Sequence, residues 1–166
     1  MNIALETLNL VRYDENKHKF LLDELEKGES SSDFIHQIGQ RLVNSKNNDR
    51  TIFQSGFVVE DKGNPIGYLY ISYMQKDEVY IEYSVLKSQR GKGYGRTIIN
   101  EVTNYLFSEH NIWQVKLDIS PSNKNSMYIA ESCGFEVDED DFEEHNFNGN
   151  MVFFKESDCY IPKMRK

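Results

Sequence analysis

The chain has 166 residues, which is enough for one domain with a buried core. Hydrophobic residues make up 39% of it and charged residues 28%, a composition typical of a soluble globular protein. The formal net charge of −8 argues against general nucleic-acid binding, which needs a basic surface, and suits a cationic small substrate better.

The termini and cysteines exclude further classes of protein. The opening residues, MNIALETLNL, lack the basic and long apolar segments of a signal peptide, and no apolar run reaches the length of a membrane span. Cys133 and Cys159 have no metal-ligand spacing and are too few for a disulfide framework. We therefore expect a cytoplasmic protein with reduced thiols, no metal and no membrane partner.

The first half of the chain predicts one strand, two helices and three further strands. Residues Leu8–Tyr13 form the first strand, and Asp14 caps a helix over residues 15–27. The segment SSSD opens a second helix, and NSKNND ends it. TIFQSGFVVE, IGYLYISYM and VYIEYSVL then alternate with short turns and are rich in β-branched and aromatic residues. These three segments predict an antiparallel meander.

The second half predicts a helix over residues 94–110, a strand at QVKLDIS and a short helix within PSNKNSMYIAESCG. FEVDED and GNMVFFKES form the last two strands, joined by an acidic connection. The expected fold is α/β or α+β, with a mixed, mostly antiparallel seven-stranded sheet and flanking helices. We expect a single domain over residues 1–166.

A glycine-rich segment lies between the third meander strand and the helix that follows. A helix N-terminus offers unpaired N–H groups, and glycine lets a phosphate approach the backbone closely. Three glycines with three flanking cations exceed what a tight turn requires. The segment therefore predicts a pyrophosphate cradle. Its glycines and cations are Gly91, Gly93, Gly95, Arg90, Lys92 and Arg96.

Three phosphate-binding motifs compete for this segment. A Walker A loop fails because Lys92 is followed by Gly93 instead of Ser or Thr. A dinucleotide-binding fingerprint needs G-x-G-x-x-G in a parallel βαβ unit, whereas this spacing is G-x-G-x-G after an antiparallel meander. The remaining candidate is a cradle for coenzyme A.

Two motifs together resemble the GCN5-related N-acetyltransferase (GNAT) superfamily. Its signature [QR]-x-x-G-x-[GA] is matched by residues 90–95, and its Asn at the start of a helix ending in Gly-Phe is matched by Asn123 and Gly134-Phe135. The resemblance covers Leu8 to Phe154 and favours the branch of ribosomal-protein N-terminal and polyamine acetyltransferases. It implies the acyl-CoA N-acyltransferase fold and acetyl transfer from acetyl-CoA, without a metal, to a small-molecule amine, a polyamine or a protein N-terminus. A monomer or homodimer is expected.

The resemblance also implies positions for the cofactor. The pantetheine arm is expected between two splayed strands, where the N–H of Val85 polarises the thioester carbonyl and stabilises the oxyanion. The pyrophosphate is expected on the amides of Gly91 to Arg96, and Asn123 is expected to contact the cofactor, although Asn also favours helix starts. The predicted cofactor-binding residues are Tyr83, Ser84, Val85, Arg90, Gly91, Lys92, Gly93, Tyr94, Gly95, Arg96, Asn123 and Ser126.

The acceptor amine must lose a proton before it attacks, and a carboxylate usually accepts it. Glu82 is the first candidate for this base, with a surface residue or cross-strand ion pair as the alternative interpretation, and Asp118 is the second candidate. Many family members protonate the leaving thiolate with a Tyr four residues before the Gly of Gly-Phe, where this chain has Ala130. Tyr128 lies about 200° away round the helix and is no simple substitute.

Several assignments stay open at this level. For the leaving thiolate, the proton donor is Ser126 or a water, or the thiolate leaves without a donor. Cys133 is interpreted as a small core residue. The acidic segment 136–144 is either a solvated loop or a surface that attracts a cationic acceptor. The early helices, with Phe34, His36 and Gln37, are expected to form one wall of the acceptor site. Transfer of a larger acyl group and a non-catalytic acyl-CoA sensor are the competing functions.

Overall fold

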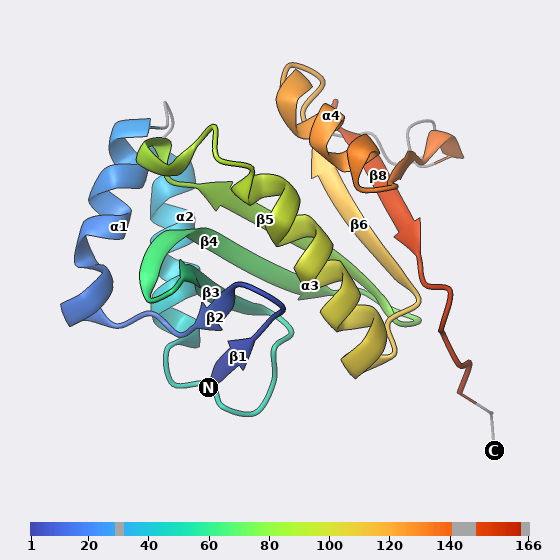
Figure 1. The fold of residues 1–166 in the computed structure, drawn as a ribbon, viewed down its shortest axis with the longest axis horizontal. Coiled ribbons are helices and arrows are strands. Elements are labelled where there is room, and N and C mark those ends of the chain that lie inside the picture. Colours follow the sequence, from blue (N-terminus) through green and yellow to red (C-terminus); the bar gives the residue numbers. More distant parts are fainter. Residues whose placement is uncertain (29–31, 141–148, 164–166) are drawn as a thin grey trace.

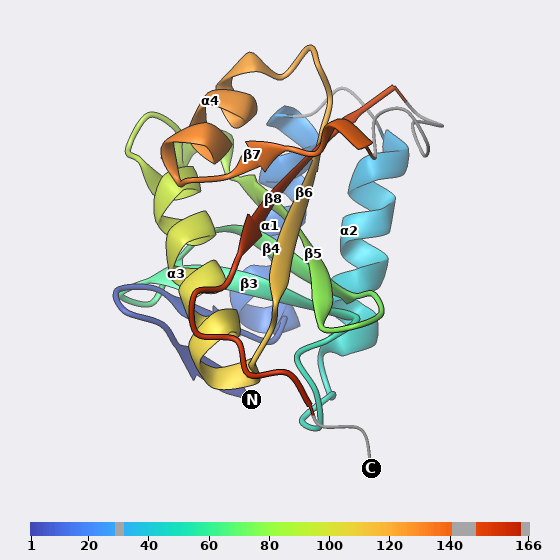
Figure 2. The same ribbon diagram turned by 90° about the vertical axis from the view of Figure 1, so that its right-hand side faces the viewer.

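The strands form one sheet between two pairs of helices (Figures 1 and 2). The computed structural model describes residues 1–28, 32–140 and 149–163, apart from the side chains of residues 25–28 and 32–35. In chain order the strands are β1 Asn2–Ala4, β2 Asn9–Val11, β3 Ser55–Asp61, β4 Asn64–Tyr73, β5 Glu78–Val85, β6 Gln114–Ile119, β7 Glu136–Val137 and β8 Met151–Glu156.

The sheet has the strand order β1-β2-β3-β4-β5-β6-β8-β7. Among the described strands, β5 and β6 make the one parallel pair, and the other neighbours are antiparallel. The expected meander is therefore present as β3, β4 and β5. The predicted count of seven strands is wrong by one, because β1 has three residues, too few to show an alternating pattern in the sequence.

The helices cover both faces of the sheet. Helices α1 and α2 lie on one face, and α3 and α4 lie on the other (Figure 2). A short 3-10 helix, η1, joins β5 to the glycine loop. The helices are α1 Glu15–Gly28, α2 Ser32–Ser45, η1 Lys87–Gln89, α3 Tyr94–His110 and α4 Lys124–Ser132.

The helix boundaries follow local signals in the sequence. Asp14 Oδ1 accepts hydrogen bonds from the backbone N–H of Asn16 (2.8 Å) and of Lys17 (3.2 Å), which caps α1 as expected. Helix α3 lies between Gly93 and Asn111, which are its N-cap and C-cap, and both of these residues have left-handed backbone angles.

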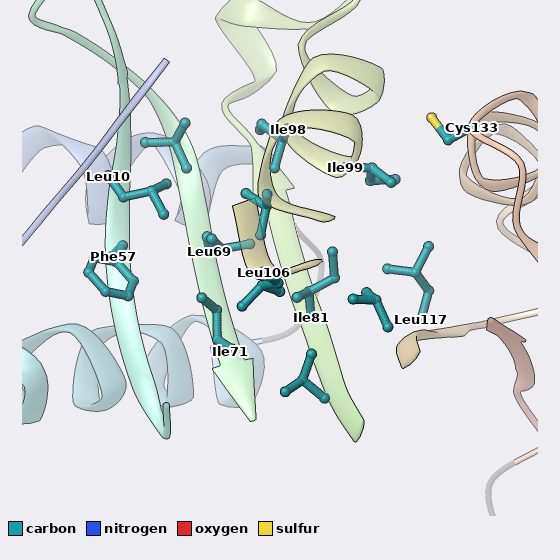
Figure 3. Packing of buried hydrophobic residues seen from close by; sticks show 14 of the residues in the cluster. Leu10, Phe57, Leu69, Ile71, Ile81, Ile98, Ile99, Leu106, Leu117 and Cys133 are labelled. Carbon is teal, nitrogen blue, oxygen red and sulfur yellow. The ribbon is translucent and has the colours of Figure 1, made fainter. Parts of the chain in front are cut away.

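Two hydrophobic clusters hold the helices against the sheet. The larger cluster packs α3 against the strands, and Figure 3 shows Ile98, Ile99 and Leu106 pointing toward Leu69 and Ile81. A smaller cluster packs α1 and α2 against the opposite face. Its buried members are Tyr13, Leu21, Ile38, Leu42, Val58, Tyr68 and Leu86.

The parallel pair β5–β6 opens along its length. The two strands are in register over Glu78–Tyr80 and Gln114–Lys116, and the pairing stops there although both strands continue. Figure 1 shows the strands close together at this end and diverging toward the glycine loop. The C-terminal half of β5 therefore keeps only β4 as its neighbour in the sheet, among the residues that the structure describes.

Candidate active site

A cleft of about 780 Å³ lies where β5 and β6 separate. It is formed by the end of β5, the glycine loop, the first turn of α3 and the cleft-facing side of α4. Its lining residues are Tyr83, Ser84, Val85, Gln89, Arg90, Gly91, Gly93, Tyr94, Gly95, Arg96, Asn123, Asn125, Ser126, Tyr128 and Ile129.

The backbone of Val85 faces the opening between the strands. Val85 is opposite Gly67 in the register, and the N–H of the next residue, Leu86, donates to Ile66 O at 2.9 Å. This pattern makes Val85 and Gly67 a non-hydrogen-bonded pair, so the N–H and C=O of Val85 point away from β4. On that side the Val85 carbonyl accepts a hydrogen bond from Arg90 Nε at 3.1 Å. Arg90 thereby ties the glycine loop to the edge of β5.

The glycine loop needs glycine for its backbone angles. Gly91 and Gly93 have φ of +79° and +82°, which residues with a Cβ rarely adopt. A Cβ at either position would meet nothing within 4 Å, so the space beside the loop is open. The positive end of the α3 dipole lies at Gly93. Lys92 is the one predicted cofactor-binding residue that does not line the cleft, and its Nζ donates to Gln89 Oε1 at 3.1 Å.

Helix α4 supplies the other wall of the cleft. Asn123 Oδ1 accepts from the backbone N–H of Ser126 at 3.1 Å, so Asn123 is a helix cap and a lining residue at once. Burial raises the pKa of the Tyr83 phenol above its ordinary value, and a hydrogen bond with Ser126 lowers it in part. Ala130 is fully buried in the core, whereas Tyr128 is 63% exposed at the cleft.

Glu82 lies on the opposite face of the sheet from this cleft. Its neighbour Tyr83 packs toward α3 and α4, whereas the carboxylate of Glu82 pairs with the guanidinium of Arg41 on α2. Arg41 Nη1 also lies 3.4 Å from the hydroxyl of Tyr68, and its guanidinium carbon lies 4.3 Å from the centre of the Tyr70 ring. The ion pair that the sequence left as the alternative interpretation of Glu82 is present, but with a helix residue.

The electrostatics of this pair keep Arg41 charged. Burial alone would lower the pKa of Arg41, but hydrogen bonds with Tyr68 and Glu82 and the charge of Glu82 raise it above its ordinary value. The side chains of Arg41 and Glu82 are 32% and 43% exposed, so solvent and small molecules reach both. The sequence did not single out Arg41. Its position beside the apolar stripe of Ile38 and Leu42 is the signal that it lies near the sheet.

The expected acceptor wall is described only in part. A small cavity of about 290 Å³ between α1 and α2 includes His36 among its lining residues, and Gln37 is exposed. The side chain of Phe34 lies outside the described residues, as do positions 141–144 of the acidic segment. Asp118 is exposed on β6, beyond the point where the pairing with β5 ends.

The structure thus brings together most of the predicted site. Every predicted cofactor-binding residue except Lys92 lines one cleft, although these residues come from two separate parts of the sequence. The sequence missed Gln89, Asn125, Tyr128 and Ile129 as lining residues. Tyr128 and Ile129 lie three and four residues after Asn125, which places both of them on the side of α4 that carries Asn125.

The described residues contain no group of three or more His, Cys, Asp or Glu side chains arranged to hold a metal ion. No helix within them combines the length and the apolar character that crossing a bilayer requires.

Solved structures share this fold. A ribosomal L7/L12 α-N-protein acetyltransferase in complex with coenzyme A is 14% identical, with a TM-score of 0.69 and coverage of 96% of this chain and 99% of that chain. A dodecameric spermidine N-acetyltransferase from Vibrio cholerae is 20% identical, with a TM-score of 0.62 and coverage of 90% and 94%. At these identities the likeness shows the fold alone.

Sequence comparisons identify the family. A spermidine N(1)-acetyltransferase from Vibrio cholerae is 31% identical over 97 residues, and the match spans 56% of this chain and 56% of that relative. The chain thus matches little more than half the length of this curated relative. The family model for the acetyltransferase (GNAT) domain matches residues 6–136. The resemblance seen in the sequence is therefore confirmed, and the chain belongs to the GNAT acetyltransferase family, whose members use acetyl-CoA.

Proposed function

We propose that this chain is an acetyl-CoA-dependent N-acetyltransferase that moves an acetyl group to a primary amine. One observation carries the proposal: the outward-pointing N–H of Val85 and the glycine loop at the start of α3 line the same cleft. A thioester with a pyrophosphate at its far end needs these two kinds of contact. The membership of the chain in the acetyltransferase family supports the assignment.

The residues present fit coenzyme A. The loop with Gly91 and Gly93 leaves open space beside its backbone, and the α3 N-terminus and Arg96 favour a negatively charged group there. When bound, acetyl-CoA supplies an acetyl group on a thioester. The N–H of Val85 then serves as a fixed hydrogen-bond donor to the thioester oxygen, where negative charge develops during attack. Asn123 and Ser126 complete the opposite wall.

Glu82 is the proposed proton acceptor for the amine, on the face of α1 and α2. Three residues of extended strand separate it from Val85, a span of about 10 Å. A proton from an amine near Val85 therefore reaches the carboxylate of Glu82 through water, with Arg41 holding that carboxylate in place. Asp118 remains the second candidate, because it lies on β6 past the point of separation.

Tyr83 and Ser126 are the proposed proton source for the leaving thiolate. Both residues carry hydroxyl groups and line the cleft, and Tyr83 belongs to the same strand as Val85. The phenol of Tyr83 is protonated at neutral pH, because its ordinary pKa is about 10 and burial raises it further. Ala130 is fully buried in the core, so position 130 offers no acid.

The acceptor is a small-molecule amine, a polyamine or a protein N-terminus under this proposal. The names of the relatives support these classes, since one is a spermidine acetyltransferase and another a ribosomal-protein acetyltransferase. A monomer or homodimer stays a prediction, and one structural neighbour is dodecameric. The single domain over residues 1–166 and the cytoplasmic location also stay predictions.

One assay tests the proposal. The purified chain is titrated with acetyl-CoA by calorimetry, and then incubated with acetyl-CoA and a panel of primary amines while free thiol is measured. We expect micromolar binding and amine-dependent thiol release. Binding without release for any amine would favour the alternative function, a non-catalytic acyl-CoA sensor. Absence of binding would remove the assignment of the cleft as a coenzyme A site.

A further inference from the structure

We propose that Arg41 and Glu82 form the acceptor site for a small amino acid, a molecule that carries a primary amine and a carboxylate. This inference rests on the proposed acetyl transfer and adds the chemical class of the acceptor. It starts from the arrangement of one cation, one anion and two tyrosines on the α1 and α2 face of the sheet.

The guanidinium of Arg41 is held in a fixed position. Its carbon lies 4.3 Å from the centre of the Tyr70 ring, and Nη1 lies 3.4 Å from the Tyr68 hydroxyl and pairs with Glu82. Stacking on an aromatic ring fixes the plane of a guanidinium, and a fixed plane presents its donors in a fork that matches a carboxylate.

With respect to the described residues, the remaining donors of Arg41 are free to bind a ligand that arrives from solvent. An arginine carries five N–H groups, on Nε, Nη1 and Nη2. Among the residues that the structure describes, all polar contacts of this side chain are made by Nη1. Nε and Nη2 have no protein acceptor within that part of the chain. Since the side chain is 32% exposed, a carboxylate arriving from solvent reaches it.

The location of the pair connects it with the proposed reaction. Glu82 lies three residues before Val85 on β5, at the part of the strand that β6 has left. Ser84 lies between them and lines the cleft. An acceptor that binds at Arg41 and Glu82 on one face therefore has its amine directed to the opening between β5 and β6.

Charge decides which amines suit this site. An ammonium that approaches Glu82 also comes close to the positive charge of Arg41, and like charges at short distance repel. A carboxylate on the same molecule binds Arg41. The ligand carboxylate, Arg41, Glu82 and the ligand ammonium then alternate in sign. A polyamine brings a second positive charge instead. The site therefore favours amines with a carboxylate over alkylamines of equal length and, more strongly, over polyamines.

The test measures the effect of the carboxylate directly. A series of ω-amino acids with two to six carbons is compared with alkylamines and α,ω-diamines of the same length, each assayed for free thiol release with acetyl-CoA. We expect at least one ω-amino acid to exceed its matched amines about 10-fold or more in kcat/KM. The chain length with the highest value reports the distance between the reacting amine and Arg41.

Variants of Arg41 link the preference to this side chain. R41Q should abolish the advantage of the ω-amino acid mainly through KM, and R41K should retain part of it because the charge remains. R50Q is the matched control, because Arg50 is an exposed arginine in the loop before β3, and it should behave as the wild-type chain. Equal turnover of alkylamines, or a carboxylate advantage that survives R41Q in a folded variant, would overturn the inference.

A binding measurement separates this inference from the proposed function. Saturation-transfer NMR detects the ω-amino acids on the wild-type chain and on R41Q without any turnover. Binding that depends on Arg41, with no thiol release from any amine, would contradict the acetyl transfer and leave Arg41 as part of an amino-acid binding site. Thiol release from amines with no detectable Arg41-dependent binding would keep the transfer and refute the acceptor class.

Discussion

The two faces of the sheet near Val85 differ in how the chain builds them. The cleft on the side of α3 and α4 comes largely from one continuous segment, residues 83–96, with a second segment at the start of α4. The opposite face depends on Arg41 meeting Glu82 across 41 positions of sequence. Local sequence therefore specifies the first face, whereas tertiary packing specifies the second.

The two faces also differ in what they present to a ligand. The cleft presents backbone groups to a ligand. They are the N–H of Val85, the N-terminus of α3 and the glycine loop, where no side chain covers the backbone at the glycines. The opposite face presents side chains, a carboxylate and a guanidinium over two tyrosines. Backbone donors suit a cofactor common to a family, and side chains suit an acceptor that differs from one member to the next. Substitutions on each face should consequently change different measured quantities.

The largest effect is expected from G93V in the glycine loop. Gly93 has a positive φ and open space beside it, so a valine both strains the loop and covers the surface where the pyrophosphate is expected. We expect the affinity for acetyl-CoA to fall by at least about 100-fold, which corresponds to roughly 3 kcal/mol. Calorimetry measures the affinity, and circular dichroism checks the fold.

G63V is the matched control for backbone strain. Gly63 lies in the turn between β3 and β4 with φ of +84°, and a Cβ at this position would also meet nothing within 4 Å. Both substitutions should cost similar stability, about 1–2 kcal/mol, but G63V should leave acetyl-CoA binding unchanged. Equal affinities in the two variants would show that the loop around Gly93 is not the pyrophosphate site.

The next effect is expected from E82Q, on the opposite face. Loss of the carboxylate removes the proposed proton acceptor, so kcat should fall by about 100-fold, while the affinity for acetyl-CoA stays the same. The difference in kcat between E82Q and the wild type should shrink as the pH rises, because a larger fraction of the amine is then neutral before it binds. Steady-state kinetics over a range of pH measure both quantities.

D118N tests the alternative base in the same assay. If D118N lowers kcat more than E82Q does, the proton acceptor is Asp118 on β6, and Glu82 does not take the proton from the amine. If E82Q changes the acetyl-CoA affinity as strongly as kcat, the separation of the two faces is wrong. A rate for E82Q that matches the wild type at every pH would exclude Glu82 as the base.

A smaller effect is expected from Y83F inside the cleft. The phenol of Tyr83 is the proposed proton donor to the thiolate, but a thiolate is a tolerable leaving group, so kcat should fall only about 10-fold. S126A should give a similar loss, and the double variant should lose little more, because both hydroxyls are proposed to serve the same proton transfer in one cleft. Y128F is the control and should keep the wild-type rate. A larger loss in Y128F than in Y83F would transfer the donor role to Tyr128.

The contrast between the faces also explains what the sequence could predict. The glycine loop and the Asn123 cap carry their signal within a few residues, so the cleft was predictable almost completely. Gln89 and three residues of α4 were missed, because lining a cleft depends on the direction of a side chain and on the packing of α4. The three residues of β1 were missed because a strand that short shows no periodicity and is stabilised by its pairing with β2.

The pairing of Arg41 with Glu82 was not predictable from the sequence. Nothing in the sequence near Glu82 indicates which helix residue will cross that point of the sheet. The contact depends on α2 packing closely on β3, where a Cβ at Gly56 would come within 3.2 Å of the backbone of Arg41. A glycine inside a β-branched strand is the sequence feature that indicates a close approach at this point of the strand, and the apolar stripe of α2 indicates only that Arg41 lies near the sheet.

The smallest effect concerns stability and compares one histidine from each side of the sheet. His18 on α1 is 1% exposed, and burial lowers its pKa, against the opposing effect of Glu60, whose Oε1 lies 3.8 Å from Nε2. His110, at the end of α3, is less buried, and burial lowers its pKa as well. In the unfolded chain both take up a proton below a pH of about 6.5.

The unfolded state therefore binds more protons than the folded state as the pH falls from about 6.5 through the lowered pKa of His18. The free energy of unfolding should decrease over that range, by at most about 1.4 kcal/mol per pH unit for each histidine. H18N should remove most of this decrease, and H110N should remove less because His110 is more exposed. Denaturation in urea at pH 7.5 and 5.0 measures the difference. If H18N keeps the pH dependence of the wild type while H110N loses it, the acid-sensitive contact lies at the end of α3, and the packing of α1 on the sheet does not respond to acid.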